Sequence, residues 1–128
     1  MIIFERGDTV LVSYPSKDGA TLHLRPAMIF HNVSANDVAV SVVPITPDPI
    51  HLSPSLFVAE GSFEAARLGL VTAGYLNACS EVVVDRQFVN RKIGRCPWRM
   101  LNEFLSLQRR PIRDWSGGGA DHYLPTQR

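Results

Sequence analysis

The sequence predicts a mainly β protein: a compact, strongly bent antiparallel sheet or small β-barrel with one α-helix near its C-terminal end. Three observations lead to this fold class. Short runs of β-branched and aromatic residues follow one another at close spacing. Glycine, proline, asparagine and aspartate separate these runs, as turn residues do. Helical periodicity is clear in one late segment, residues 97–109. A helix there would cover an open end or face of the sheet.

The first part of the chain contains three predicted strands. Residues 7–15 alternate in a strand pattern, and the Asp-Gly turn chemistry of residues 16–20 follows them. A second strand is predicted to begin at Pro26, because proline cannot donate to a ladder and fits a strand's first position. Residues 38–45 form a nearly continuous β-branched run. Such a run indicates a third strand that is buried on both faces.

The middle of the chain is less regular. Prolines crowd residues 44–54, which favours a loop or a sheet edge. Short strands are predicted at residues 56–58, 69–73 and 81–85, and residues 62–68 form either a helical turn or a hairpin. Residues 86–94 are interpreted as a connection that contains at most one helical turn.

The predicted helix, residues 97–109, begins with a proline, which is tolerated in the first turn. Pro111 ends it. Its predicted inner face consists of large apolar residues and one glutamine: Trp98, Leu101, Phe104, Leu105 and Gln108.

Length and composition indicate one soluble globular domain. The chain has 128 residues, of which 45% are hydrophobic and 20% charged. We expect the domain to span residues 1–110 and residues 111–128 to form a flexible tail. The sequence contains neither a membrane-spanning apolar run nor a basic segment typical of a secretory signal, so a cytoplasmic location is expected. Cys79 and Cys96 are expected to be free thiols, and no metal site is predicted.

The formal net charge of +1 argues against a strongly electrostatic nucleic-acid binder. The charge is unevenly distributed, however. Between Arg86 and Arg113 there are eight basic residues and one acidic residue, Glu103. This segment either attracts phosphate or forms an ordinary solvated surface.

Three segments, in order, carry a resemblance to a known family: Gly7-Asp8-Thr9-Val10-Leu11-Val12, Arg25-Pro26-Ala27-Met28-Ile29 and Val43-Pro44-Ile45-Thr46. Gly69-Leu70-Val71 and Lys92-Ile93-Gly94-Arg95 follow at similar places. Together they resemble the MazF/PemK toxins of bacterial type II toxin–antitoxin systems, over about residues 4–108.

The resemblance implies an SH3-like small β-barrel of the MazF/CcdB type that usually forms a homodimer. It also implies sequence-selective, metal-independent endoribonuclease activity on single-stranded RNA, including mRNA, with no cofactor. A cognate antitoxin protein would wrap the toxin and fill the groove for RNA.

Metal-free RNA cleavage uses the ribose 2′-OH as nucleophile, so the protein must orient the phosphate, stabilise its charge and move protons. Arg25 is the candidate for the phosphoryl oxygens, because a guanidinium donates in a planar fork. Thr46 would add a hydroxyl donor to the same phosphate. The resemblance implies that these two residues are catalytic.

Auxiliary and RNA-binding roles are assigned to further polar residues. His23 and His31 stand at even spacings from Arg25, and histidine titrates near neutral pH. Asp48 would orient one of them. Lys17, in the Asp-Gly loop, would contact RNA phosphate, and Asn77 is the RNA-facing candidate in the later strand region.

Three segments depart from the family's pattern: residues 22–24, 47–48 and 75–85. Two alternatives therefore stay open beside the nuclease. One is a barrel toxin of the CcdB kind, which inhibits growth by binding a protein target. The other is a degenerate member that only binds an antitoxin. Retention of both Arg25 and Thr46 favours the nuclease. Nucleotide hydrolysis is disfavoured, because the sequence lacks a phosphate-cradling glycine loop.

Overall fold

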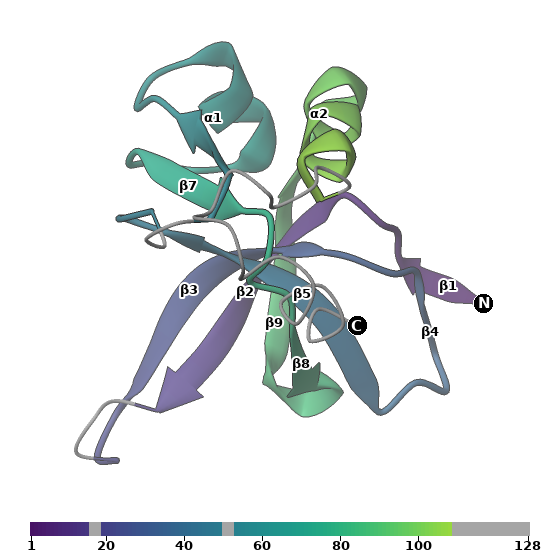
Figure 1. The fold of residues 1–128 in the computed structure, drawn as a ribbon. Helices are drawn as coiled ribbons and strands as arrows, with labels where there is room; N and C mark the ends of the chain where they lie inside the picture. Colours follow the sequence, from purple (N-terminus) through teal and green to yellow (C-terminus); the bar gives the residue numbers. More distant parts are fainter. Residues whose placement is uncertain (16–18, 50–52, 109–128) are drawn as a thin grey trace, which may run out of the picture.

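The computed structural model describes residues 1–15, 19–49 and 53–108, and the predicted tail at 111–128 lies outside them. The described chain is mainly antiparallel β-sheet with a C-terminal helix, which confirms the predicted fold class (Figure 1). The elements, in chain order, are β1 (Ile2–Phe4), β2 (Asp8–Pro15), β3 (Leu22–Ile29), β4 (Val33–Ser34), β5 (Ala39–Thr46), β6 (Ser55–Val58), α1 (Phe63–Leu68), β7 (Gly74–Asn77), β8 (Val82–Asp85), the 3-10 turn η1 (Arg86–Phe88), β9 (Val89–Arg95) and α2 (Trp98–Gln108).

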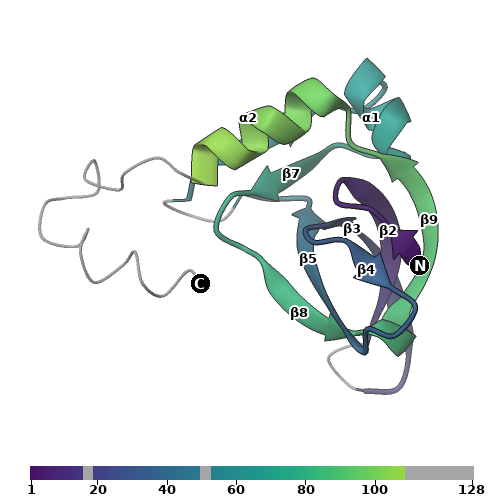
Figure 2. The same cartoon turned by 90° about the vertical axis from the view of Figure 1, so that its right-hand side faces the viewer.

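The sheet topology explains the barrel shape. The strand order is β6-β7-β5-β3-β2-β9, with β8 paired to β5, while β1 and β4 form a separate pair. In the path β8-β5-β3-β2-β9, the two end strands are joined by η1 alone, a turn of 3 residues. Such a short connection requires the sheet to curl until β8 and β9 approach each other. Figure 2 shows the strands curling in this way, with α2 lying across one end beside α1.

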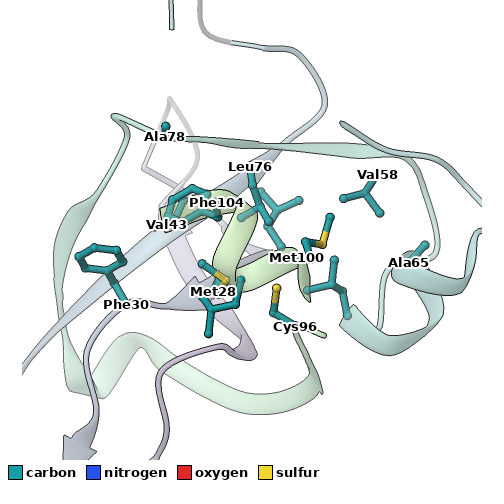
Figure 3. Packing of buried hydrophobic residues seen from close by; sticks show 13 residues of the cluster. Met28, Phe30, Val43, Val58, Ala65, Leu76, Ala78, Cys96, Met100 and Phe104 are labelled. Atoms are coloured by element: carbon teal, nitrogen blue, oxygen red, sulfur yellow. The ribbon is translucent and has the colours of Figure 1, made fainter. Parts of the chain in front are cut away.

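Strands β3 and β5 separate two apolar cores. One core lies beneath the two helices and includes Met28, Val43, Leu76 and Phe104 (Figure 3). The second core lies on the other face of the same strands, and its members are Val10, Val12, Ala27, Ile29, Val33, Val40 and Val42. Because successive strand residues point to opposite faces, a strand buried on both faces needs an unbroken apolar run. The predicted strand buried on both faces is confirmed for residues 40–45, whereas Val38 is 78% exposed and precedes the strand.

Helix α1 has a defined beginning and end. The Ser62 side chain accepts a hydrogen bond from the Ala65 N–H at 3.1 Å, as an N-cap does. Gly69 ends the helix with φ +81°, in the left-handed region that favours glycine. A Cβ at Gly69 would also collide with the Ile93 carbonyl of β9. The predicted strand at 69–73 is therefore wrong, because Gly69 caps a helix and the next strand begins at Gly74.

Three further differences from the predictions have physical reasons. Pro26 lies inside β3 and not at its beginning. Pairing of β3 with β5 starts only at Ala27, so the side of β3 that faces β5 is a free edge at Pro26, and proline is tolerated there. The predicted connection at 86–94 contains β9, an edge strand whose exposed polar residues hide the alternation. Trp98 is 73% exposed, because α2 turns the face formed by Met100, Leu101 and Phe104 toward the core and leaves Trp98 outside it.

The buried carboxylate of Asp8 joins the first long strand to the last. It accepts a hydrogen bond of 2.7 Å from Arg95 Nη1 and lies 3.2 Å from Lys92 Nζ. It also accepts the Glu5 N–H at 2.8 Å. Two strands from opposite ends of the described chain are thereby fixed to each other. Within the described ranges, no helix is long and apolar enough to cross a membrane.

Candidate functional site

A hollow of about 370 Å³ opens where β2, β3, β5 and β8 meet. Its volume lies within the range of about 300–1,000 Å³ that is usual for ligand sites. Three of its side chains are polar and the others give an apolar wall rich in proline. The lining residues are Tyr14, Arg25, Pro26, Pro44, Ile45, Thr46, Pro47 and Val82.

Strand register brings Arg25 and Thr46 to this hollow. Ala27 of β3 and Pro44 of β5 form the terminal pair of the β3–β5 ladder, and Arg25 and Thr46 each lie two residues beyond that pair on their own strands. Both side chains line the hollow. The two residues assigned to catalysis thus lie in the wall of one solvent-open cavity, which is wide enough for a ligand.

Tyr14 enters the hollow from β2. In the β2–β3 ladder, Val12 pairs with Arg25 and Tyr14 with His23. Tyr14 and Arg25 are therefore diagonal neighbours on one sheet face, within reach of long side chains. In Figure 1 this β2–β3 hairpin extends well beyond the body of the barrel.

The Thr46 hydroxyl is held by two hydrogen bonds. It donates to the main-chain oxygen of Asp48 at 2.7 Å and accepts from Asn77 Nδ2 at 3.1 Å. A threonine hydroxyl has a single proton. In this arrangement that proton is directed at a backbone carbonyl, and Thr46 presents no donor to the hollow.

The Tyr14 hydroxyl is in the opposite situation. It is buried and has no hydrogen-bond partner among the described residues. Burial raises the pKa of Tyr14 above its ordinary value of 10.0, and the positive charge of Arg25 offsets part of this rise. The phenol therefore stays protonated at neutral pH, as a hydrogen-bond donor with nothing bound to it.

Arg25 is exposed, and the described residues give it no acidic partner. No carboxylate lines the hollow. The local charge is consequently positive and available to an anion. The structural alternative for Arg25, an edge-strand residue held in an ion pair, is not what the described part of the chain shows.

The other candidate residues lie apart from the hollow's lining. His23 is exposed and pairs with Tyr14 on the same sheet face as Arg25. His31 packs edge-on against Phe30, and its Nε2 lies 3.9 Å from the Glu81 carboxylate.

Two of the remaining candidates have different positions from those expected, and one lies outside the structure. Asp48 contributes its main-chain oxygen to Thr46, while its side chain is exposed. Asn77 is fully buried, so its amide supports Thr46 and does not face RNA directly. Lys17 lies outside the described residues.

The basic segment that begins at Arg86 has mainly structural contacts where it is described. Lys92 and Arg95 bind the buried Asp8. Arg86 Nη1 donates to two main-chain oxygens, of Ser34 at 3.3 Å and Ala35 at 2.7 Å. These three cations stabilise the barrel, which favours the interpretation of this segment as a structural surface.

A larger hollow, of about 610 Å³, lies between β6, α1 and α2. Its wall includes the carboxylates of Glu64 and Glu103 as well as Arg99. The negative charges of these two carboxylates would repel a polyanion from this larger hollow. Among the described residues, no group of three or more His, Cys, Asp or Glu side chains could hold a metal ion.

Sequence reasoning missed Tyr14, which was treated only as a strand residue. A signal was present: Tyr14 precedes the Asp-Gly turn by a few residues, so a hairpin through that turn places it beside the segment that leads to Arg25. Asn77 and Thr46 are 31 residues apart, and no local pattern links them.

The described residues form a small curled β-barrel with a C-terminal helix, and solved MazE–MazF complexes share this fold. The MazE–MazF complex of Deinococcus radiodurans is similar at 18% identity with a TM-score of 0.61, covering 84% of this chain and 94% of that chain. A second crystal form of that complex gives a TM-score of 0.59 over 83% and 92%.

An endoribonuclease in complex with its cognate antitoxin from a mycobacterial species is also similar, at 18% identity and a TM-score of 0.52, over 82% of this chain and 90% of that one. No family model and no curated protein sequence matches this chain. At this level of identity the likeness establishes the fold, and the chain has the fold of MazF.

Proposed function

We propose that this protein is the toxin of a type II toxin–antitoxin pair and cleaves single-stranded RNA without a metal ion. The observation that carries the proposal is the meeting of Arg25 and Thr46 in one open hollow with no carboxylate in its wall. The neighbours in fold support it, because they include MazF bound to MazE and an endoribonuclease bound to its antitoxin.

The reaction needs little from the protein beyond geometry and charge. The ribose 2′-OH attacks the adjacent phosphorus, the bond to the 5′-oxygen breaks, and the products end in a 2′,3′-cyclic phosphate and a 5′-OH. Arg25 would bind the non-bridging oxygens as negative charge grows on them. The proline-rich wall would pack against ribose or base and exclude water.

Proton transfer is assigned to groups at the rim of the hollow. The 2′-OH must lose a proton and the 5′-oxygen must gain one. His23, beside Tyr14 on the face of Arg25, is the candidate for this transfer, because one imidazole nitrogen can accept a proton while the other donates one. Thr46 would act either through its oxygen or after its proton turns away from the Asp48 carbonyl.

The proposal includes a protein partner. A cognate antitoxin would cover the hollow and exclude RNA. The homodimer that the resemblance implies stays a prediction, which light scattering of the purified chain checks.

Cleavage mapping tests the proposed function. The purified chain is incubated with a long single-stranded RNA in EDTA, and the product ends are identified. We expect cleavage at short sequences that is abolished in Arg25→Ala and strongly reduced in Thr46→Ala. Arg67→Ala is a matched control, because Arg67 is an exposed arginine of α1 that stacks on Phe63 and lies outside the hollow.

Two results would refute the assignment. Cleavage by Arg25→Ala at the wild-type rate would remove Arg25 from the reaction. Cleavage of a substrate with deoxyribose 5′ to the scissile phosphate would exclude attack by the 2′-OH. Growth arrest without any RNA cleavage would instead favour a CcdB-like toxin that binds a protein.

A further inference from the structure

We propose that Tyr14 is the third phosphate-binding group of the hollow and supplies the hydroxyl donor to the scissile phosphate. The inference rests on the proposed function and assigns a residue that the sequence resemblance does not include. It identifies Tyr14, and not Thr46, as the source of the neutral donor, because the Thr46 proton already has a main-chain acceptor.

The first support is position. Tyr14 lines the same hollow as Arg25 and Thr46. It reaches the hollow from β2, whereas Arg25 comes from β3 and Thr46 from β5. Three adjacent strands therefore contribute one polar side chain each, and the rest of the wall is apolar. Convergent polar groups in an apolar hollow are typical of a site that fixes the orientation of its ligand.

The second support is the hydrogen-bond balance of the two hydroxyls. The single proton of Thr46 is directed at the Asp48 carbonyl, and Asn77 holds the oxygen from the buried side. The Tyr14 hydroxyl is buried and unpartnered among the described residues. Buried polar groups normally have partners, and exceptions gather at functional sites. Because the hydroxyl oxygen itself is buried, the ring must rotate slightly toward the hollow when a ligand binds, and a phosphoryl oxygen would then satisfy this orphaned donor.

The third support is charge. Arg25 is close enough to Tyr14 for its positive charge to act on the phenol, although burial is the larger influence on the pKa of Tyr14 and raises it. A neutral phenol beside a guanidinium gives two donors for two oxygens of one phosphate. Tyr14 donates a hydrogen bond and keeps its proton, so the cleavage reaction needs no additional proton acceptor.

Steady-state kinetics of Tyr14→Phe test the inference, because this change removes only the hydroxyl. We expect kcat to fall by about 100-fold, as for the loss of one preorganised donor to a transition state, with a much smaller change in KM. Tyr75→Phe is the matched control; Tyr75 packs on Phe57 and lies outside the lining of the hollow. A purely structural hydroxyl would lower the melting temperature of Tyr14→Phe, whereas an orphaned one would not.

The outcomes separate this inference from the proposed function. If the wild type cleaves RNA and Tyr14→Phe cleaves it with the same kcat, the role of Tyr14 is overturned and the nuclease stands. If the wild type does not cleave RNA, the proposed function fails, and binding of a fluorescent single-stranded oligodeoxynucleotide decides the role of Tyr14. Weaker binding by both Tyr14→Phe and Arg25→Ala would retain the phosphate site. Equal binding by Tyr14→Phe and the wild type would remove Tyr14 from it.

Discussion

Removal of the Tyr14 hydroxyl should stabilise the protein while it damages the site. A buried polar group without a partner costs about 1–3 kcal/mol. The Tyr14 side chain as a whole is only half-buried, so the lower end of this range applies. We expect Tyr14→Phe to raise the free energy of unfolding by about 1 kcal/mol, or the melting temperature by about 4 °C.

Urea denaturation measures this change directly. The midpoint should shift to higher urea at an unchanged slope, because the surface exposed on unfolding is nearly the same. The pH dependence gives a second check. Burial raises the pKa of Tyr14 above 10.0 in the folded state, so above about pH 10 the unfolded state loses a proton that the folded state keeps.

Wild-type stability should therefore decline as the pH rises through this range, and the decline should be smaller in Tyr14→Phe. A destabilisation of about 1 kcal/mol or more in Tyr14→Phe at neutral pH would refute the reasoning. That result would mean that the hydroxyl has a partner in the folded protein, and that it is not available to a phosphate.

Three other changes test the fold and the support of the site. Gly69→Ala should destabilise the protein by clearly more than Gly61→Ala in thermal unfolding. Both glycines have positive φ, which costs about 1–2 kcal/mol for alanine. Only the Cβ at position 69 would also meet the Ile93 carbonyl. Equal losses would show that the α1–β9 contact is not tight. Phe104→Ala should cost about 3–5 kcal/mol in urea unfolding, against less than about 0.5 kcal/mol for the exposed Trp98→Ala on the same helix; similar values for both would contradict the described core. Burial raises the pKa of the Cys96 thiol to about 12. A thiol reagent at pH 8 should therefore modify the half-buried Cys79 first and Cys96 only on unfolding. Rapid reaction of both thiols in the native protein would rule out the buried position of Cys96.

The sequence predicts best those strands whose burial is visible in the pattern of apolar residues along the strand itself. Residues 39–46 are apolar at nearly every position because both faces of β5 are covered, and this is visible without any partner. Strand β9 was missed for the converse reason. It is an edge strand with polar residues on its exposed positions, and only its pairing with β2 makes it a strand.

The candidate site divides in the same way. Arg25 and Thr46 came from a resemblance in short segments, and they share a hollow because each lies two residues beyond the terminal pair of the β3–β5 ladder. The contact of Asn77 with Thr46 depends on the folding of β7 against β5, far along the chain. The orphaned hydroxyl of Tyr14 is a property of its surroundings, which a sequence pattern does not contain.

The pairing of β2 with β9 has a consequence for how the protein matures. The ladder joins Asp8 to Arg95, so β2 completes its pairing only after 87 more residues have been synthesised. Contacts so distant along the chain slow folding. Tyr14 belongs to β2, and all the residues that line the hollow are synthesised before β9, the strand that pairs with the other edge of β2. Until β9 has been made, that edge of β2 has no strand partner in the chain, and an unpaired strand edge favours contacts with other chains.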